Sequence, residues 1–387
     1  MLYIHALALG GKMGIFAKLL VLLVCAGLYL TFHLQLQPLP SSTYLLPEPP
    51  AAADEPVFQQ TWVSSEETDE AHSASIALLI TGQPVAVWYG GTEEGHADVA
   101  LFLSILNNTW STPIAIADRL TTEKGLSRYI RKVGNPTVHV WPDGNLGVFY
   151  VSVSVGGWGA SAINYIESSN TGRSWSKPNR LVTSPFLNIS TLVRTNAVER
   201  QDGYIELPVY HEFAGKFSES LIISRDIQVI DKRRISWGKD SLQPAIAPLD
   251  ETTALALLRY AGEPPGRIWA VTSTNTGENW TEPELINLPN PNAAVALLNI
   301  GNGNLLLALN DTEDGRNRLS LAVRRIDTSR WQIVKTLEAE TNTPEVEYEF
   351  SYPSLVMDSD DNIHLVYTWN QKRIKHTKFN LAWLNKS

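Results

Sequence analysis

The hydrophobic pattern of this chain is a recurring tight turn followed directly by an apolar strand. The turns lie near residues 82, 144, 203, 251, 303 and 361, so the repeat is roughly 50 to 60 residues long. Asp-Gly and Asn-Gly turns tolerate positive φ and favour hairpins, and the residues after them are β-branched, leucine or aromatic, as strands prefer. Hardly any segment beyond residue 57 has a helical period. The spacing therefore predicts an all-β fold, a β-propeller with six four-stranded blades.

A second pattern recurs inside these units. The octet SSNTGRSW ends at Trp175 and the octet STNTGENW ends at Trp280, with degenerate copies ending at Trp110 and Trp331. In such an octet Asn or Ser bonds its own backbone, Gly takes positive φ and Trp packs under the blade. The octets resemble the Asp-box of the sialidase superfamily, with Asn in place of Asp. We therefore expect a structural role for them.

The two ends of the repeat region are expected to close the ring. Residues 57–64 (VFQQTWVS) form a plausible strand beside 373–384, which places both chain ends in one blade. The predicted propeller domain is 57–387.

The segment before the propeller is apolar from Met13 to Phe32, with Lys18 as its one charge. Lys12 and Lys18 precede the apolar stretch, and no Lys or Arg follows until Arg119. This asymmetry predicts a cytoplasmic N-terminus at 1–12 and a transmembrane signal anchor at 13–34. A cleaved signal peptide is the alternative. Residues 35–56, rich in Pro and Ala, are predicted to be an extended linker. The anchor would hold the propeller on the periplasmic or extracytoplasmic side, and cleavage would secrete it.

Composition narrows the functional classes. The 387 residues are 44% hydrophobic and 18% charged, with a net charge of −9. A net acidic chain disfavours nucleic-acid binding, which needs a basic face. The single cysteine, Cys25, excludes an internal disulfide and a multi-cysteine zinc site. The sequence has no phosphate-binding glycine loop, His-rich metal cluster or dinucleotide fingerprint, so we expect neither metal nor cofactor.

The resemblance to sialidases covers roughly residues 57–384 and extends to site residues. Tyr352, in EFSYPSL before the last hairpin, resembles the nucleophilic tyrosine of the family. Sialidases hold the substrate carboxylate with three arginines, and two have counterparts here. Arg259 follows Gln243-Pro244 in the family's spacing, and Arg316 precedes a leucine-rich strand, where it fits better than Arg318. A guanidinium matches both oxygens of a carboxylate.

The departures from the family pattern are as informative as the matches. His72 stands where the first family arginine is expected, and Gln243 replaces the glutamate that polarises the tyrosine. The acid/base aspartate normally comes from the loop after the first hairpin. In this chain that loop offers Glu94 and Asp98 as alternatives.

Two further stretches are expected to face the central cavity. Trp158, in the glycine-rich segment GGWGAS, is a candidate for stacking on a sugar ring, and Tyr210 and His211 follow the third hairpin strand at the height of Arg259. The alternative is that Trp158 packs between blades and His211 is simply hydrogen-bonded. Asn135, before Pro136, is a weaker candidate.

Three functions are compatible with these residues. The first is a sialidase-like exo-glycosidase for an anionic, sialic-acid-like or uronic-acid-containing glycan, with Tyr352 as nucleophile. The second is a uronate-specific polysaccharide lyase, in which Arg neutralises the carboxylate and Tyr or His removes the proton. The third is a membrane-tethered glycan-binding propeller without turnover. The expected partners are an anionic carbohydrate and the membrane.

Overall fold

The computed structural model describes residues 15, 19–20, 22–27, 42–47, 55–64, 66–184, 188–238, 240–343 and 345–386. The chain divides into two compact units, Met1–Ser41 and Ser42–Ser387. In the first unit the described residues are helical. Among the residues that the structure describes, no helix is long and apolar enough to cross a membrane. Most of the predicted anchor at 13–34 lies outside the described residues, so the anchor stays a prediction.

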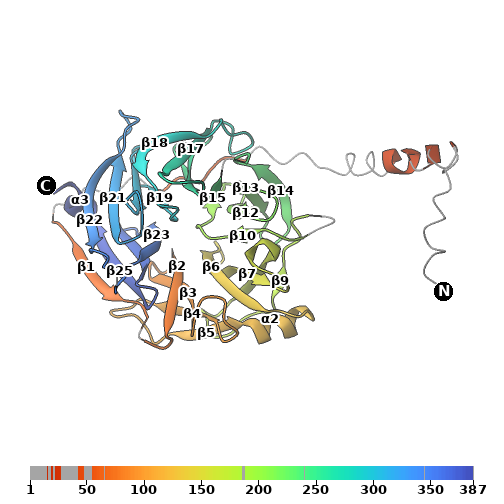
Figure 1. Ribbon diagram of the computed structural model, residues 1–387, viewed down its shortest axis with the longest axis horizontal. Helices are drawn as coiled ribbons and strands as arrows, with labels where there is room; N and C mark the ends of the chain where they lie inside the picture. The colour runs from red at the N-terminus through yellow and green to blue at the C-terminus, as the bar shows by residue number, and fades with distance from the viewer. Residues whose placement is uncertain are drawn as a thin grey trace. The chain divides into compact units, whose positions relative to one another are not determined.

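The second unit is a six-bladed β-propeller, as the turn spacing predicts (Figure 1). Blade 1 contains β2 (Glu70–Leu78), β3 (Pro84–Gly91), β4 (Ala100–Ile105) and β5 (Ile114–Asp118). Blade 2 contains β6 (Lys132–Val140), β7 (Leu146–Val153), β8 (Ser161–Ser168) and β9 (Asn179–Arg180). Blade 3 contains β10 (Leu192–Val193), β11 (Val198–Glu199), β12 (Ile205–His211), β13 (Phe217–Ile223) and β14 (Val229–Arg234).

The remaining blades follow the same antiparallel order. Blade 4 contains β15 (Ser241–Pro248), β16 (Ala254–Tyr260), β17 (Arg267–Ser273) and β18 (Glu284–Pro289). Blade 5 contains β19 (Ala296–Asn299), β20 (Leu305–Leu309), β21 (Arg318–Arg324) and β22 (Gln332–Ala339). Blade 6 contains β23 (Phe350–Met357), β24 (Asn362–Trp369), β25 (Arg373–Asn380) and β1 (Phe58–Trp62).

The ring closes in blade 6, where the first strand of the chain pairs with the last. Strand β1 runs antiparallel to β25, with Phe58 opposite Phe379 and Trp62 opposite Lys375. The core lies between neighbouring sheets as a series of apolar clusters, for example the cluster that joins Val87 of blade 1 to Val148 of blade 2. Strands such as β3, β7 and β20 are buried on both faces, which explains why they are nearly continuous hydrophobic runs.

The two Asp-box octets have the same internal geometry. Ser168 Oγ accepts from the backbone N–H of Gly172 at 2.8 Å, and Trp175 Nε1 donates to the carbonyl of Gly172 at 3.1 Å. The second octet repeats both bonds, and Trp280 Nε1 donates to the carbonyl of Gly277 at 3.2 Å. The glycines adopt φ of 83° and 81°, a conformation that residues with a Cβ rarely adopt. The octets are turn-forming units, as expected.

Residues 42–47 correct the prediction of an extended linker over 35–56. Tyr44 is fully buried and donates its N–H to the carbonyl of Glu251 at 2.9 Å. Arg200 Nη2 donates to the carbonyl of Ser42 at 2.7 Å. This N-terminal strap, residues 42–47, is therefore part of the propeller. Two short helices also went unforeseen: α2 (Arg119–Leu126), capped by Asp118, and α3 (Leu381–Asn385).

Candidate functional site

One residue of each blade lies on or beside the innermost strand at the same position, nine residues before the hairpin turn. These six residues, the axial ring, are Ser73 before Gly82, Asn135 before Gly144, Arg194 before Gly203, Gln243 before Thr252, Asn292 before Gly301 and Tyr352 before Asp361. All except Arg194 adopt positive φ, between 46° and 55°. At four of them the strand register shifts, which marks a β-bulge. Bulges turn side chains out of the sheet and are frequent beside active sites.

Tyr352 is the centre of this arrangement. Its half-buried ring meets the ring of His72 edge-on, with the centroids 4.7 Å apart. The guanidinium carbons of Arg194 and Arg316 lie 5.0 Å and 5.5 Å from the Tyr352 ring centroid. The ring of Tyr352 therefore lies between two guanidinium groups.

Arg259 and Arg316 are held together by one residue, Asn292. Arg259 Nε donates to Asn292 Oδ1 at 2.7 Å, and Arg316 Nη2 donates to the Asn292 carbonyl at 3.0 Å. Arg316 Nη1 also pairs with Glu349 at 3.1 Å. Burial disfavours the charge on Arg316, but the neighbouring Tyr352 and Glu349 outweigh burial and raise its pKa. Arg318, the alternative in the sequence, is exposed at the start of β21.

Gln243 hydrogen-bonds Arg259 and Tyr210 rather than the candidate nucleophile, Tyr352. Its Oε1 accepts from Arg259 Nη1 at 3.0 Å, and its Nε2 donates to the Tyr210 hydroxyl at 3.2 Å. The same hydroxyl accepts from Asn135 Nδ2 at 3.3 Å. Asn135, Tyr210 and Gln243 therefore form a neutral chain of hydrogen bonds that orients Arg259.

The two acid/base candidates lie in different surroundings. Glu94 Oε2 is 3.9 Å from Nε2 of the buried His72, and Glu94 hydrogen-bonds the buried Tyr89. Asp98 is exposed, and hydrogen bonds from the Thr92 hydroxyl and from His96 lower its pKa to about 2. A carboxyl group with so low a pKa is a poor general acid at neutral pH. The geometry favours Glu94.

Two candidates are engaged elsewhere. His211 is buried, and its Nε2 is 2.6 Å from Glu219 Oε2 within blade 3. Trp158 packs against an apolar cluster shared by blades 2 and 3, and the ammonium group of Lys132 covers its ring at 3.8 Å. These contacts match the structural alternative that the sequence left open for each residue.

Four residues of the site were missed at the sequence level: Tyr89, Arg194, Asn292 and Glu349. The signal that could have found two of them is the spacing to the turn. Arg194 and Asn292 stand nine residues before Gly203 and Gly301, the same distance that separates Tyr352 from Asp361.

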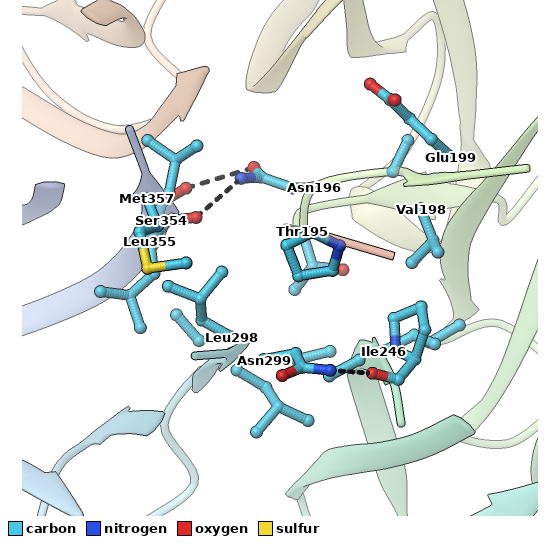
Figure 2. Close-up of a pocket in the computed structure, with 18 of the residues that line it drawn as sticks. Thr195, Asn196, Val198, Glu199, Ile246, Leu298, Asn299, Ser354, Leu355 and Met357 are labelled. Carbon is cyan, nitrogen blue, oxygen red and sulfur yellow. Dashed lines mark hydrogen bonds between the residues drawn. The ribbon is translucent and has the colours of Figure 1, made fainter. Parts of the chain in front are cut away.

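A cavity of about 400 Å³ lies further along the inner strands, on the other side of residues 194–196. Figure 2 shows Asn196 reaching across it to Ser354 and Leu355. Its lining is largely apolar and includes Leu45 and Leu46 of the N-terminal strap. The cavity excludes Tyr352, Arg259 and Arg316. Within the described part of the chain, no cluster of three or more His, Cys, Asp or Glu side chains is arranged to hold a metal ion.

Comparison with known proteins gives a consistent result. A family model described as a BNR repeat-like domain matches residues 82–365. A Hadza microbial sialidase is 16% identical with a TM-score of 0.67, over 83% of this chain and 68% of that one. The intramolecular trans-sialidase of Ruminococcus gnavus is 12% identical with a TM-score of 0.65, over 84% and 98%. The sialidase of Trypanosoma rangeli is 16% identical with a TM-score of 0.64, over 85% and 60%. No curated protein matches.

Proposed function

Because this chain belongs to the BNR repeat-like family and has the six-bladed propeller fold of sialidases, we propose that it is a glycoside hydrolase for anionic glycans. Membership of the family and the propeller fold describe the scaffold of the protein. A fold alone does not assign a substrate. The proposal therefore rests on the chemistry of the axial residues.

The observation that carries the proposal is the hydrogen bonding of the Arg259 guanidinium group. Both of its recorded hydrogen bonds go to neutral amide oxygens, of Asn292 at 2.7 Å and Gln243 at 3.0 Å. These bonds orient the guanidinium without neutralising it. An oriented positive charge beside a second arginine, Arg316, suits the planar carboxylate of a sialic or uronic acid.

In the proposed reaction Tyr352 is the nucleophile. Its oxygen bonds to the anomeric carbon as the glycosidic bond breaks, and Glu94 gives its proton to the leaving oxygen. The phenolic proton passes to solvent, since neutral Gln243 cannot take it. Water then attacks the anomeric carbon with Glu94 as base, which releases the sugar, and the Tyr352 oxygen leaves as a phenolate that takes its proton back from solvent. A neutral phenol avoids the repulsion that a carboxylate nucleophile would meet beside the substrate's own carboxylate.

One observation favours a second candidate, a lyase that acts on uronic acids. Burial lowers the pKa of His72 to about 4, so its imidazole is neutral at pH 7 and lies edge-on to Tyr352. A tyrosine beside a neutral imidazole and a carboxylate clamp matches the groups needed to remove a proton next to that carboxylate, with Tyr352 as the base.

The test is a screen of the purified protein against sialosides, uronides and matched neutral glycosides. Release of an anionic sugar without new ultraviolet absorbance supports the hydrolase. An absorbing, unsaturated product supports the lyase instead. Binding of the anionic glycans without any product would contradict both and leave a binding propeller. The membrane-anchored, extracytoplasmic location is part of the same proposal and needs its own topology measurement.

A further inference from the structure

Arg194 is the charged residue of the axial ring, and its side chain is buried in the protein. Its residue exposure is 1%, and it follows directly after β10 in blade 3. The segment that it begins ties several blades together. Thr195 Oγ1 donates to the carbonyl of Pro244 in blade 4, and Asn196 Nδ2 donates to the carbonyl of Ile76 in blade 1 at 3.1 Å. Because the two residues after Arg194 are hydrogen-bonded to two other blades, the Arg194 backbone has little freedom.

The guanidinium group of Arg194 binds the backbone that carries Tyr352. Nη2 donates to the carbonyl oxygens of Tyr352 and of Pro353, the latter at 3.3 Å. These two residues lie where the pairing of β23 with β24 is interrupted, between Ser351 and Ser354. Tyr352 has φ of 52°, a left-handed conformation that costs free energy in a residue with a Cβ. The bonds from Arg194 supply partners to carbonyl groups that the bulge takes out of the sheet.

The charge of Arg194 has no carboxylate among its significant ionisable neighbours, which are the phenols of Tyr352, Tyr210 and Tyr89 and the imidazole of His72. Burial lowers the pKa of Arg194 to about 10, so it stays charged at neutral pH. Its Nε and Nη1 are buried without a hydrogen-bond partner in the described part of the chain. A buried cation with unsatisfied donors is costly, and such costs are retained mainly at functional sites.

We propose that Arg194 is a positioning residue for Tyr352: it fixes the left-handed bulge and, from inside the protein, stabilises the negative charge that develops on the phenol oxygen as it attacks. This inference rests on the proposed function, in which Tyr352 attacks the substrate. It accounts for activation of the tyrosine without the family glutamate, whose place Gln243 takes. Two cations, Arg194 and Arg316, then act on one phenol.

Two variants of the full chain test the charge of Arg194. Arg194→Lys keeps the charge and loses the planar fork, whereas Arg194→Gln keeps a donor for the carbonyl groups and loses the charge. Arg200→Gln is the matched control. Arg200 is also buried in blade 3 and also donates to backbone carbonyls, of Ser42 and Thr276, but it lies at the N-terminal strap.

The first readout needs no substrate. Tetranitromethane nitrates phenolate in preference to phenol, and mass spectrometry measures nitration of each tyrosine separately. Arg194→Gln is expected to slow nitration of Tyr352 about tenfold or more, because one nearby charge in a low-dielectric site is lost. Arg194→Lys and Arg200→Gln are expected to stay within about threefold of wild type. An unchanged rate in Arg194→Gln overturns the proposal.

The wild type alone gives a second measurement if Arg194→Gln fails to fold. Tyr348 is half-buried on the same segment and stacks on Phe350. Nitration of Tyr352 should exceed that of Tyr348 by about tenfold, and equal rates overturn the proposal. Once a substrate is known, Arg194→Gln should lower kcat with KM unchanged. Failure of the substrate screen with fast, Arg194-dependent nitration would sink the proposed function and leave this inference standing.

Discussion

The imidazole of His72 meets the phenol ring of Tyr352 edge-on, with the ring planes inclined by 82°. His72 is 3% exposed, and burial lowers its pKa to about 4. At neutral pH the position where sialidases have their first arginine therefore holds an uncharged ring. A third guanidinium beside Arg194 and Arg316 would add like-charge repulsion. The proposed carboxylate clamp therefore consists of Arg259 and Arg316.

Replacing Tyr352 by Phe tests the nucleophile most directly. The ring and its packing are kept and the hydroxyl is lost, so unfolding free energy should change by about 1 kcal/mol. Turnover of the best anionic substrate should fall at least about 100-fold. Steady-state constants measure the change, and melting curves control for stability. Tyr348→Phe, on the same segment, should retain full turnover. Equal turnover for wild type and Tyr352→Phe would remove the tyrosine from the mechanism.

Arg259 provides a test of substrate charge. Arg259→Lys keeps the charge but loses the fork set by Asn292 and Gln243, so binding of an anionic sugar should weaken by about 1–3 kcal/mol. Neutral analogues without the carboxylate should bind nearly as before. The exposed Arg318→Lys is the matched control and should leave both affinities unchanged. If Arg259→Lys weakened acidic and neutral ligands alike, Arg259 would be supporting the blade rather than the carboxylate.

His139 allows the pH dependence of stability to be assigned to one group. It is buried beside Trp141, and burial lowers its pKa to about 4. The unfolded chain takes up this proton near pH 6.5, so the contribution is complete above pH 6.5 and falls as the pH drops toward 4. His139→Gln should therefore reduce the slope of unfolding free energy by about 1.4 kcal/mol per pH unit between pH 6 and 5.

Urea unfolding at several pH values measures this slope. Comparing slopes isolates His139 from Glu199 and from the buried Glu206, whose raised carboxyl pKa values act with the opposite sign. Parallel slopes for wild type and His139→Gln would show that His139 has no such linkage.

The sequence predicts repeated features better than single ones. The six turns, the Asp-boxes and the closing pair of strands recur or follow from closure, and the fold confirms them. Arg194 escaped notice because β10 has two residues and no visible alternation. The positive φ of Tyr352 and Gln243 is a tertiary effect of the bulge, although the proline that follows each is visible in the sequence. Tyr44 was hidden because a proline-rich segment indicates a linker unless a partner surface is known.

The N-terminal strap leads to the last prediction. Tyr44 is fully buried against blades 3 and 4, with the guanidinium carbon of Arg200 5.6 Å from its ring centroid. Leu45 donates its N–H to the carbonyl of Glu199 at 3.0 Å. A chain that begins at residue 57 loses these contacts and exposes apolar surface of Ile246 and Val271, which pack in the same cluster. It should be less stable than a chain that begins at residue 42.

Tyr44→Ala in the full chain should reproduce most of this loss, about 3–5 kcal/mol for truncating a buried aromatic side chain. The exposed Leu45 offers a control in the same strap, and Leu45→Ala should cost much less. Urea unfolding of the two truncations and two variants measures the four values. Because the strap docks on the turn between β15 and β16, at the opposite end of the strands from Arg259, turnover per folded molecule should be unchanged. Equal stability of the chains that begin at 42 and at 57 would show that the strap is dispensable.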